Sequence, residues 1–166
     1  MNNIILIGMP GAGKSTIGVI LAKTLGYGFS DTDLIIQKEE NELLQNIINT
    51  KGLETFLKIE EDVVSKIHYE NTVVATGGSV VYSEKAMRHL KEIGKIVYLE
   101  VPLPIIEERL KNIKTRGIAM KMGQDIKTLY EERIPLYEKY RDIKVNAGKM
   151  LIEQTIEEIV KEISNN

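Results

Sequence analysis

The sequence lacks several residue types, and each absence narrows the possible functions. Its 166 residues include no cysteine, no tryptophan and only two histidines. Without cysteine the chain can form no disulfide framework and carry out no thiol chemistry, and we do not expect a zinc site. The formal net charge is −2, which gives no electrostatic reason to expect a nucleic-acid or membrane partner.

Long hydrophobic runs are absent as well. No apolar stretch approaches the roughly 18 residues that suggest a membrane-spanning helix. The first residues carry neither the basic start nor the cleavage site of a signal peptide. The length suits one domain with a substantial core. We therefore expect a single domain over 1–166 that is cytoplasmic and, by default, monomeric.

The most informative segment is residues 8–16. Their sequence, GMPGAGKST, fits the phosphate-binding pattern G-x-x-x-x-G-K-[ST], with Gly8, Gly13, Lys14 and Ser15 at the fixed places. A loop that wraps a phosphate chain must turn its backbone N–H groups inward, and glycine allows this at low cost. Lys14 would supply a positive charge for the β- and γ-phosphates, and Ser15 a hydroxyl for Mg²⁺.

The residues on either side of this loop support the match. Residues 3–7, NIILI, form a continuous apolar run that is typical of a buried parallel strand. Apolar residues recur at helical spacing over 17–25, and Gly26 is expected to end that helix. The helix would aim its N-terminal N–H groups at the bound phosphate. An ordinary glycine turn is the alternative, and it does not explain this strand–loop–helix order.

Two acids follow the second expected strand, at residues 28–31. Asp31 and Asp33 lie where this strand gives way to a helix, at the carboxyl edge of the sheet and beside the phosphate-binding loop. Asp31 is better placed to hold Mg²⁺, whereas Asp33 can accept the proton of an attacking hydroxyl. The alternative is that Asp31 or Thr32 only caps the helix, which leaves the second acid unexplained.

Residues 33–69 are expected to be helical throughout. One apolar face over 43–48 ends before Gly52, and a second helix is predicted over 53–69. The block is too long for a simple crossover between parallel strands, so we expect an inserted helical lobe. The acidic run 60–62 would by default form a solvated helix face.

The remainder of the chain alternates between strands and helices. Further strands are expected over 72–76, 95–101 and 143–147, and further helices after Ser83, after Pro102, from Asp125 and from Leu151. Pro135 suggests a break or kink in its helix near Arg133. The alternation predicts an α/β fold in three layers, with five parallel strands between helices on both faces.

Two loops are candidates for ligand contact. Gly77 and Gly78 follow the strand at 72–76 and permit close approach to a ligand, although a plain turn explains them equally well. Residues 114–124 have no periodicity, are basic and are bounded by glycine. Such a segment is typical of a mobile lid, over about 112–124, and a surface loop with incidental charge is the alternative.

Together these features predict a small-molecule kinase. The loop implies a nucleoside triphosphate and Mg²⁺, and the absence of an N-K-x-D stretch weakens a GTPase assignment. Phosphoryl transfer needs positioning and charge neutralisation, for which Lys14, Mg²⁺ and arginines of a closing lid are available. Asp33 is the candidate that orients the acceptor hydroxyl and accepts its proton.

The sequence resembles the shikimate kinase family over nearly its whole length. The resemblance is carried by GMPGAGKST at 8–16, F-x-D-T-D at 29–33, Phe56-x-x-x-Glu60, Thr76-Gly77-Gly78, Arg116 and Arg133-x-Pro135-Leu136-Tyr137. It implies the P-loop fold of nucleoside monophosphate kinases. It also implies transfer of the γ-phosphate of ATP to the 3-hydroxyl of shikimate, in the route to aromatic amino acids.

The resemblance implies a role for each matching residue. ATP would be bound by the loop, by lid arginines and near the turn after the last strand, through Gly11, Ala12, Gly13, Lys14, Ser15, Thr16, Arg109, Arg116 and Asn146. Mg²⁺ would be held by Ser15 and Asp31. The acceptor would contact Asp33, Gly77, Gly78 and Arg133, with the arginine on its carboxylate. Lys14, Asp33 and Arg116 would be catalytic.

Three positions depart from the family pattern. The acceptor helix of the family reads F-R-x-x-E, but the arginine position is Leu57 here. Losing that charge-assisted contact would cost about 1.5–3 kcal/mol of binding free energy. Lys58 points about 100° away on a helix and is not expected to substitute. The third glycine of the family is Ser79, and the lid pattern R-P-L reads RGI at 116–118.

These departures leave two further hypotheses open. One is a kinase of the same fold that acts on another small hydroxylated acceptor, such as a sugar acid or a hydroxy amino acid. The other is a nucleotide-binding module without catalysis, against which the intact Lys14, Ser15, Asp31 and Asp33 argue.

Overall fold

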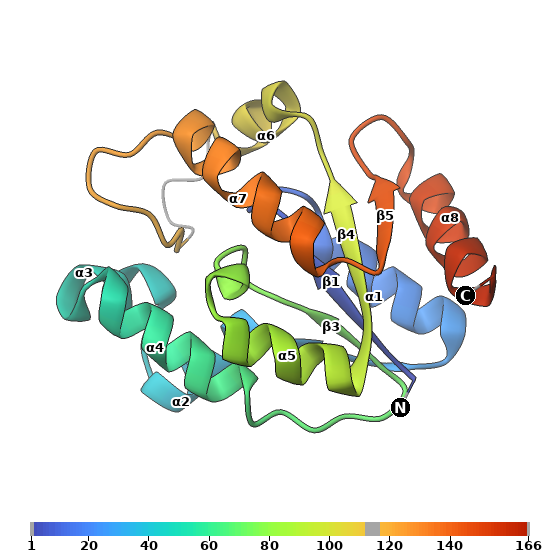
Figure 1. Cartoon of the computed structure of the whole chain (residues 1–166), viewed down its shortest axis with the longest axis horizontal. Coiled ribbons are helices and arrows are strands. Elements are labelled where there is room, and N and C mark those ends of the chain that lie inside the picture. Colours follow the sequence, from blue (N-terminus) through green and yellow to red (C-terminus); the bar gives the residue numbers. More distant parts are fainter. Residues whose placement is uncertain (1, 112–116, 166) are drawn as a thin grey trace.

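The computed structural model describes residues 2–111 and 117–165. At its centre is a five-stranded sheet with the strand order β2-β3-β1-β4-β5 (Figure 1). Every neighbouring pair of strands is parallel, which confirms the predicted sheet. The strands are β1 (Asn3–Ile7), β2 (Gly28–Asp31), β3 (Thr72–Ala75), β4 (Gly94–Glu100) and β5 (Ile143–Asn146).

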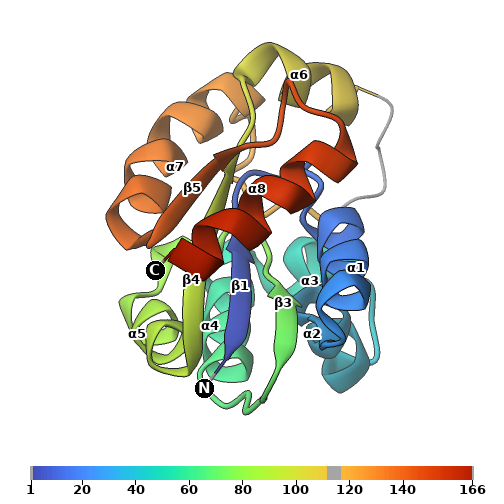
Figure 2. The same ribbon diagram turned by 90° about the vertical axis from the view of Figure 1, so that its right-hand side faces the viewer.

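Helices connect these strands and cover the sheet. They are α1 (Lys14–Leu25), α2 (Thr32–Glu40), α3 (Leu44–Lys51), α4 (Leu53–Val64), α5 (Glu84–Ile93), α6 (Leu103–Leu110), α7 (Ile126–Tyr140) and α8 (Ile152–Asn165). A 3₁₀ turn, η1, spans Val80–Tyr82. Figure 2 shows α5 and α7 on one side of the sheet and α1 on the other. The three-layer α/β fold is therefore confirmed.

The central strand β1 forms the middle of the hydrophobic core. All five of its residues are buried, as a parallel strand covered on both faces requires. Its one polar residue, Asn3, donates from Nδ2 to the backbone oxygens of Tyr69 (2.6 Å) and Ile93 (2.9 Å). Asn3 also accepts from the backbone N–H of Thr72 at 3.0 Å. These bonds join the amino ends of the central strands. Because the strands are parallel, their carboxyl ends all lie at the opposite edge of the sheet.

A helical lobe, α2 to α4, is inserted between β2 and β3 at one end of the molecule (Figure 1). It has an apolar cluster of its own, which consists of Ile36, Leu44, Ile47, Phe56, Val63 and Ala119. Ala119 comes from residues 117–124, which precede α7 and are here called the lid segment. A methyl group placed at Gly117 would lie only 2.3 Å from Cβ of Leu44. The lid segment therefore packs directly against the lobe.

Two helices, α4 and α7, differ from the sequence-based predictions in where they end or whether they break. α4 ends at Val64 and not at residue 69. The apolar spacing continues to the buried Ile67, but that residue lies in the extended return to β3. The predicted break near Arg133 is wrong, because α7 runs without interruption through Pro135. A proline removes only one backbone donor, and the buried Arg133 and Tyr137 hold this helix in place on either side.

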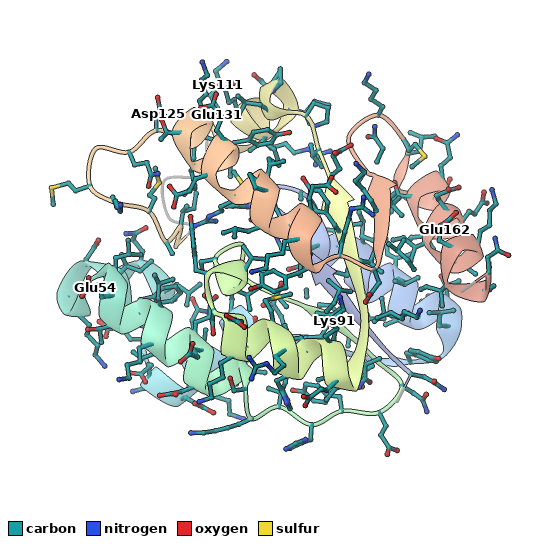
Figure 3. The ribbon with its side chains drawn as sticks, in the orientation of Figure 1. Glu54, Lys91, Lys111, Asp125, Glu131 and Glu162 are labelled. Atoms are coloured by element: carbon teal, nitrogen blue, oxygen red, sulfur yellow. The ribbon has the colours of Figure 1, made fainter. Side chains whose placement is uncertain are left out.

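The lid segment is irregular, and charged side chains cover the surface. Residues 117–124 contain neither helix nor strand, and the rest of the predicted lid, including Arg116, lies outside the described residues. Charged side chains such as Glu54, Lys91 and Lys111 point away from the fold (Figure 3). Within 2–111 and 117–165, no helix combines the length and the apolar character needed to cross a membrane.

Candidate active site

The loop between β1 and α1 has the conformation that phosphate binding requires. Gly11 and Gly13 have φ angles of +82° and +90°, which side-chain-bearing residues rarely adopt. The ammonium group of Lys14 is buried and donates to the backbone oxygens of Gly8 (2.7 Å) and Met9 (2.8 Å). The loop therefore holds its lysine folded inward, at the start of a helix whose N–H groups face the same space.

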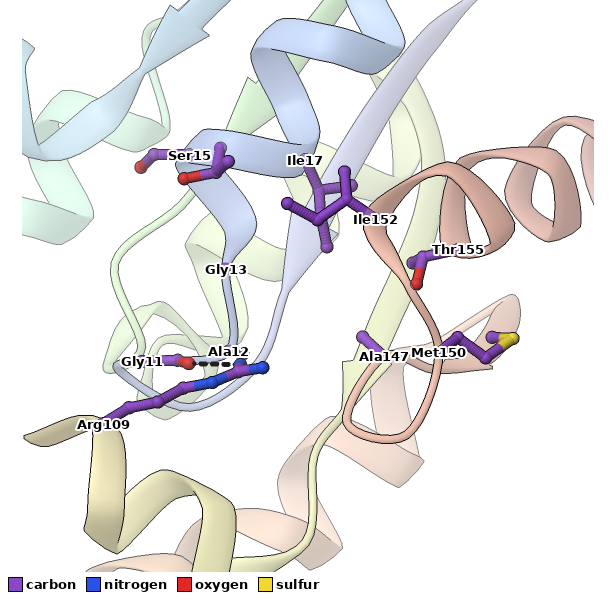
Figure 4. Close-up of a pocket in the computed structure, with 11 residues that line it drawn as sticks. Gly11, Ala12, Gly13, Ser15, Ile17, Arg109, Ala147, Met150, Ile152 and Thr155 are labelled. Atoms are coloured by element: carbon purple, nitrogen blue, oxygen red, sulfur yellow. Dashed lines mark hydrogen bonds between the residues drawn. The ribbon is translucent and has the colours of Figure 1, made fainter.

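A cavity of about 350 Å³ lies beside this loop (Figure 4). Six of the residues predicted to bind ATP line it, namely Gly11, Ala12, Gly13, Ser15, Thr16 and Arg109, whereas Lys14 does not. Nη1 of Arg109 donates to the backbone oxygen of Gly11 at 2.8 Å, which holds α6 over the loop. The far wall consists of Ala147, Met150, Ile152 and Thr155. Asn146 does not line the cavity, and its Oδ1 instead accepts from the backbone N–H of Gly148.

The two predicted metal ligands meet at the edge of this cavity. Oγ of Ser15 donates to Oδ2 of Asp31 at 2.8 Å. The other oxygen of Asp31 accepts from the backbone N–H of Asp33 at 2.9 Å and so caps α2. Asp31 is thus both a helix cap and a partner of the loop serine. A hydroxyl and a carboxylate at this distance form an oxygen donor set that fits Mg²⁺.

A second, smaller cavity brings together the residues predicted to bind the acceptor. Asp33, Gly77, Gly78 and Arg133 all line it, together with Lys14 and Ser15 from the loop. Ser15 lines both cavities, so a phosphate chain can pass from one to the other across the loop. The volume is only about 30 Å³, comparable to one water molecule, because residues 117–119 of the lid segment close it.

At the two glycines of this cavity there is no room for a side chain. A methyl group placed at Gly77 would lie 2.7 Å from both Oδ1 of Asp33 and Oε2 of Glu60. One placed at Gly78 would lie 2.8 Å from Nη1 of Arg133. Both contacts are shorter than real Cβ contacts. The acidic and cationic side chains can therefore converge only because the backbone between them carries no side chain, and a plain turn does not explain this.

Arg133 is a buried cation, with 1% of its surface exposed. Its Nη2 donates to the backbone oxygen of Ala119 at 2.5 Å, and its Nε donates to the hydroxyl of Tyr82 at 3.2 Å. None of the ion pairs among the described residues involves this arginine. Both of these hydrogen bonds are to neutral oxygens, although Glu60 and Glu132 also interact with the arginine electrostatically, and a buried guanidinium so held favours the binding of an anion beside it.

Glu60 is a buried acid to which the sequence analysis gave no role in the site. Only 2% of its surface is exposed, so the expectation of a solvated face over 60–62 is wrong at this residue. Ser79 donates to its Oε1 at 2.7 Å, and its Oε2 has no hydrogen-bond partner among the described residues. Burial, with a smaller contribution from the charge of Asp33, raises the pKa of Glu60 to about 7. The helical spacing from buried Phe56 to Glu60 was the available signal.

Comparisons with known proteins agree with this geometry. A sequence profile described as shikimate kinase matches residues 10–164. The chain belongs to the shikimate kinase family. The shikimate kinase of Persephonella marina is 35% identical over 164 residues, which cover 98% of this chain and 99% of that protein. The one from a Sulfurihydrogenibium species is 37% identical, with 98% of each chain covered.

A solved shikimate kinase gives the same result for the fold. The enzyme from Acinetobacter baumannii, in complex with shikimate, superposes with a TM-score of 0.92. It is 28% identical in sequence, and the superposition covers 100% of this chain and 94% of that chain. The match therefore extends over the sheet, the lobe and the helices around both cavities.

Two departures from the shikimate kinase pattern can now be located. Leu57 is half-buried and does not line the acceptor cavity. It faces a neighbouring cavity of about 270 Å³ whose walls include Tyr82 and Ala119. Lys58 is exposed and lines neither cavity, so it does not replace the family arginine. Ser79 lines the acceptor cavity, where its hydroxyl is bound to Glu60.

Proposed function

We propose that this chain transfers the γ-phosphate of ATP to a hydroxyl of shikimate. The observation that carries the proposal is the acceptor cavity, which is lined at once by the phosphate-binding Lys14 and Ser15 and by Asp33 and Arg133. An acceptor held there lies next to the phosphate chain, as direct transfer requires. Membership of the shikimate kinase family selects shikimate as the acceptor.

The residues of the loop would bind and neutralise the phosphates. Lys14 would exchange the carbonyl oxygens of Gly8 and Met9 for phosphate oxygens, a short movement for a flexible ammonium group. Ser15 and Asp31 would hold Mg²⁺, which neutralises charge on the transferring phosphates when bound. Arg109 would add a further positive charge from α6.

On the acceptor side, we assign to Asp33 the role of accepting the proton of the attacking hydroxyl. Its position after β2 is fixed by the hydrogen bond from its backbone N–H to Asp31, and its side chain reaches Gly77 on the neighbouring strand end. A carboxylate there can orient the attacking hydroxyl and accept its proton as the hydroxyl oxygen bonds to the γ-phosphorus and the bond from that phosphorus to ADP breaks. The backbone of Gly77 and Gly78 would form the floor beneath the acceptor.

We assign to Arg133 the role of binding the carboxylate of the acceptor. Its guanidinium is buried, borders the cavity and has neutral oxygens as its hydrogen-bond partners. A carboxylate would replace the neutral oxygen of Ala119 as the acceptor and so form an ion pair with the guanidinium. Because that oxygen belongs to the lid segment, admission of the acceptor would displace residues 117–119. Arg116, expected to cover the phosphates, lies outside the described residues and stays a prediction.

The test is an ADP-release assay on purified protein with ATP and Mg²⁺. Shikimate is compared with a panel of sugar acids, polyols and hydroxy amino acids, and the product is identified by mass spectrometry. Lys14→Met is expected to abolish turnover, while Lys23→Met, an exposed lysine on the same helix, serves as the matched control. We expect a dominant, Lys14-dependent rate on shikimate. A negligible rate on shikimate with a clear rate on another acceptor would refute the assignment and support a kinase with a rebuilt acceptor pocket.

A further inference from the structure

The guanidinium of Arg133 is held by several groups, among them the side chain of Tyr137 on the same helix. Nε donates to the hydroxyl of Tyr82, and Nη2 donates to the oxygen of Ala119 in the lid segment. Nη1 lies against Gly78, where a methyl group would approach it to 2.8 Å. Of these contacts, the one to Ala119 is made by a segment that must move when an acceptor enters. The contact to Tyr82 comes from η1, which is part of the main body of the fold.

Tyr82 makes two contacts with the arginine. The guanidinium carbon of Arg133 lies 5.2 Å from the centroid of the tyrosine ring, within cation–π distance. The hydroxyl of Tyr82 donates its single proton to Oε1 of Glu132 at 2.9 Å, which leaves a lone pair directed at Nε. Burial raises the pKa of Tyr82 above its ordinary value, so the hydroxyl keeps this proton at neutral pH.

Glu132 is itself held in place. Its second oxygen, Oε2, accepts from Nε2 of Gln124 at 3.0 Å, at the end of the lid segment. The bond from Tyr82 to Glu132 does not depend on Gln124, because Glu132 belongs to α7, and it therefore fixes the direction of the tyrosine hydroxyl when the lid segment moves. A fixed hydroxyl constrains the plane of the guanidinium, because Nε donates along one direction in that plane.

We propose that Tyr82 is a positioning residue for recognition of the acceptor carboxylate, because it fixes the guanidinium plane of Arg133 while the oxygen of Ala119 leaves and the carboxylate arrives. This inference rests on the proposed function. With an apolar residue at position 57, a single arginine carries this recognition, and a long flexible side chain must be oriented to bind a carboxylate with two hydrogen bonds. Without the hydroxyl of Tyr82, Nε would lose its acceptor in the main body of the fold, and the guanidinium would keep only its contacts with Gly78 and Tyr137 there.

The test compares three single variants with the wild type. Tyr82→Phe keeps the ring but removes the hydroxyl, and it is expected to raise the KM for shikimate about tenfold, with the KM for ATP unchanged. Tyr130→Phe is the matched control, because it removes a tyrosine hydroxyl that donates to Val101 from the same helix as Arg133. Arg133→Lys reports whether the arginine holds the carboxylate at all. Calorimetric binding of shikimate gives a second readout that does not depend on turnover.

A further variant tests the link without altering the tyrosine. Glu132 is exposed, so Glu132→Ala should fold normally and raise the KM for shikimate about threefold, by releasing the hydroxyl of Tyr82. A raised KM for shikimate in both Tyr82→Phe and Glu132→Ala, but not in Tyr130→Phe, supports the inference. If Arg133→Lys raises that KM and Tyr82→Phe leaves it within twofold of wild type, the inference is overturned and the proposed function stands. If neither variant changes it, the carboxylate role of Arg133 fails, and the inference fails with it.

Discussion

Replacement of Glu60 by glutamine tests the electrostatics of the acceptor cavity most directly. Burial raises the pKa of this carboxyl from 4.5 to about 7 in the folded protein, whereas the unfolded chain keeps the ordinary value. Between those two pH values the folded state binds more protons than the unfolded state. Its free energy of unfolding therefore falls as the pH rises from about 4.5 to about 7.

The size of the effect follows from the two pKa values. At 1.36 kcal/mol for each tenfold change in proton affinity, the interval from 4.5 to about 7 corresponds to about 3 kcal/mol. This stabilisation is complete below about pH 4.5 and lost above about pH 7. Glu60→Gln lacks the titrating group, so its stability relative to wild type is expected to rise by about 2–3 kcal/mol between pH 5 and pH 8.

The assay is urea denaturation followed by far-ultraviolet circular dichroism, since the chain has no tryptophan to serve as a fluorescent probe. Acidic groups distant from Glu60 are unchanged in the variant, so their contributions cancel in the difference. Glu54→Gln, at an exposed position on the same helix, is the control and should show no such trend. A difference between Glu60→Gln and wild type that stays constant from pH 5 to pH 8 would refute the reasoning.

Four further outcomes are expected. Leu57→Arg should lower the KM for shikimate about tenfold by restoring a charge-assisted contact, and an unchanged KM would argue against this. Ser15→Ala should raise the Mg²⁺ concentration for half-maximal rate by on the order of tenfold, which a magnesium titration checks. Ser83→Ala should lower the free energy of unfolding by about 1 kcal/mol in urea, because Ser83 caps α5 through Ala86. Amide exchange over 117–124 should slow when ATP and shikimate are both present, and equal exchange would contradict a closing lid.

The phosphate side of the site could be predicted because its residues act through backbone geometry that is local in sequence. The glycines, Lys14 and Ser15 form one continuous motif, and a strand and a helix on either side place it at the sheet edge. Asp31 and Asp33 follow the same logic at the end of β2, which is separated from β1 by β3 alone. Parallel pairing brings these strand ends together whatever the intervening chain does.

The acceptor side of the site was harder to predict from the sequence, because its contacts join residues that are far apart in the chain. Glu60 was assigned to a solvated run, since nothing in residues 60–62 indicates that Ser79 lies against it. Tyr82 follows a glycine pair in a 3₁₀ turn, and no motif marks its contact with Arg133 on a helix 51 positions later. The helix through Pro135 also persisted, because tertiary packing outweighed the local preference of proline.

The position of Ala119 has a consequence for how acceptor affinity varies with temperature. Its methyl group belongs to the apolar cluster of the lobe, while its backbone oxygen holds Arg133. Displacing the lid segment therefore exposes apolar surface to water, and this part of its stabilisation weakens on cooling. Closure of the segment over a bound acceptor would restore the burial and carry a negative heat-capacity change. Because the segment already covers this surface before the acceptor enters, opening and closure cancel, and the segment would curve a plot of the logarithm of affinity against inverse temperature only if it stayed displaced in the complex.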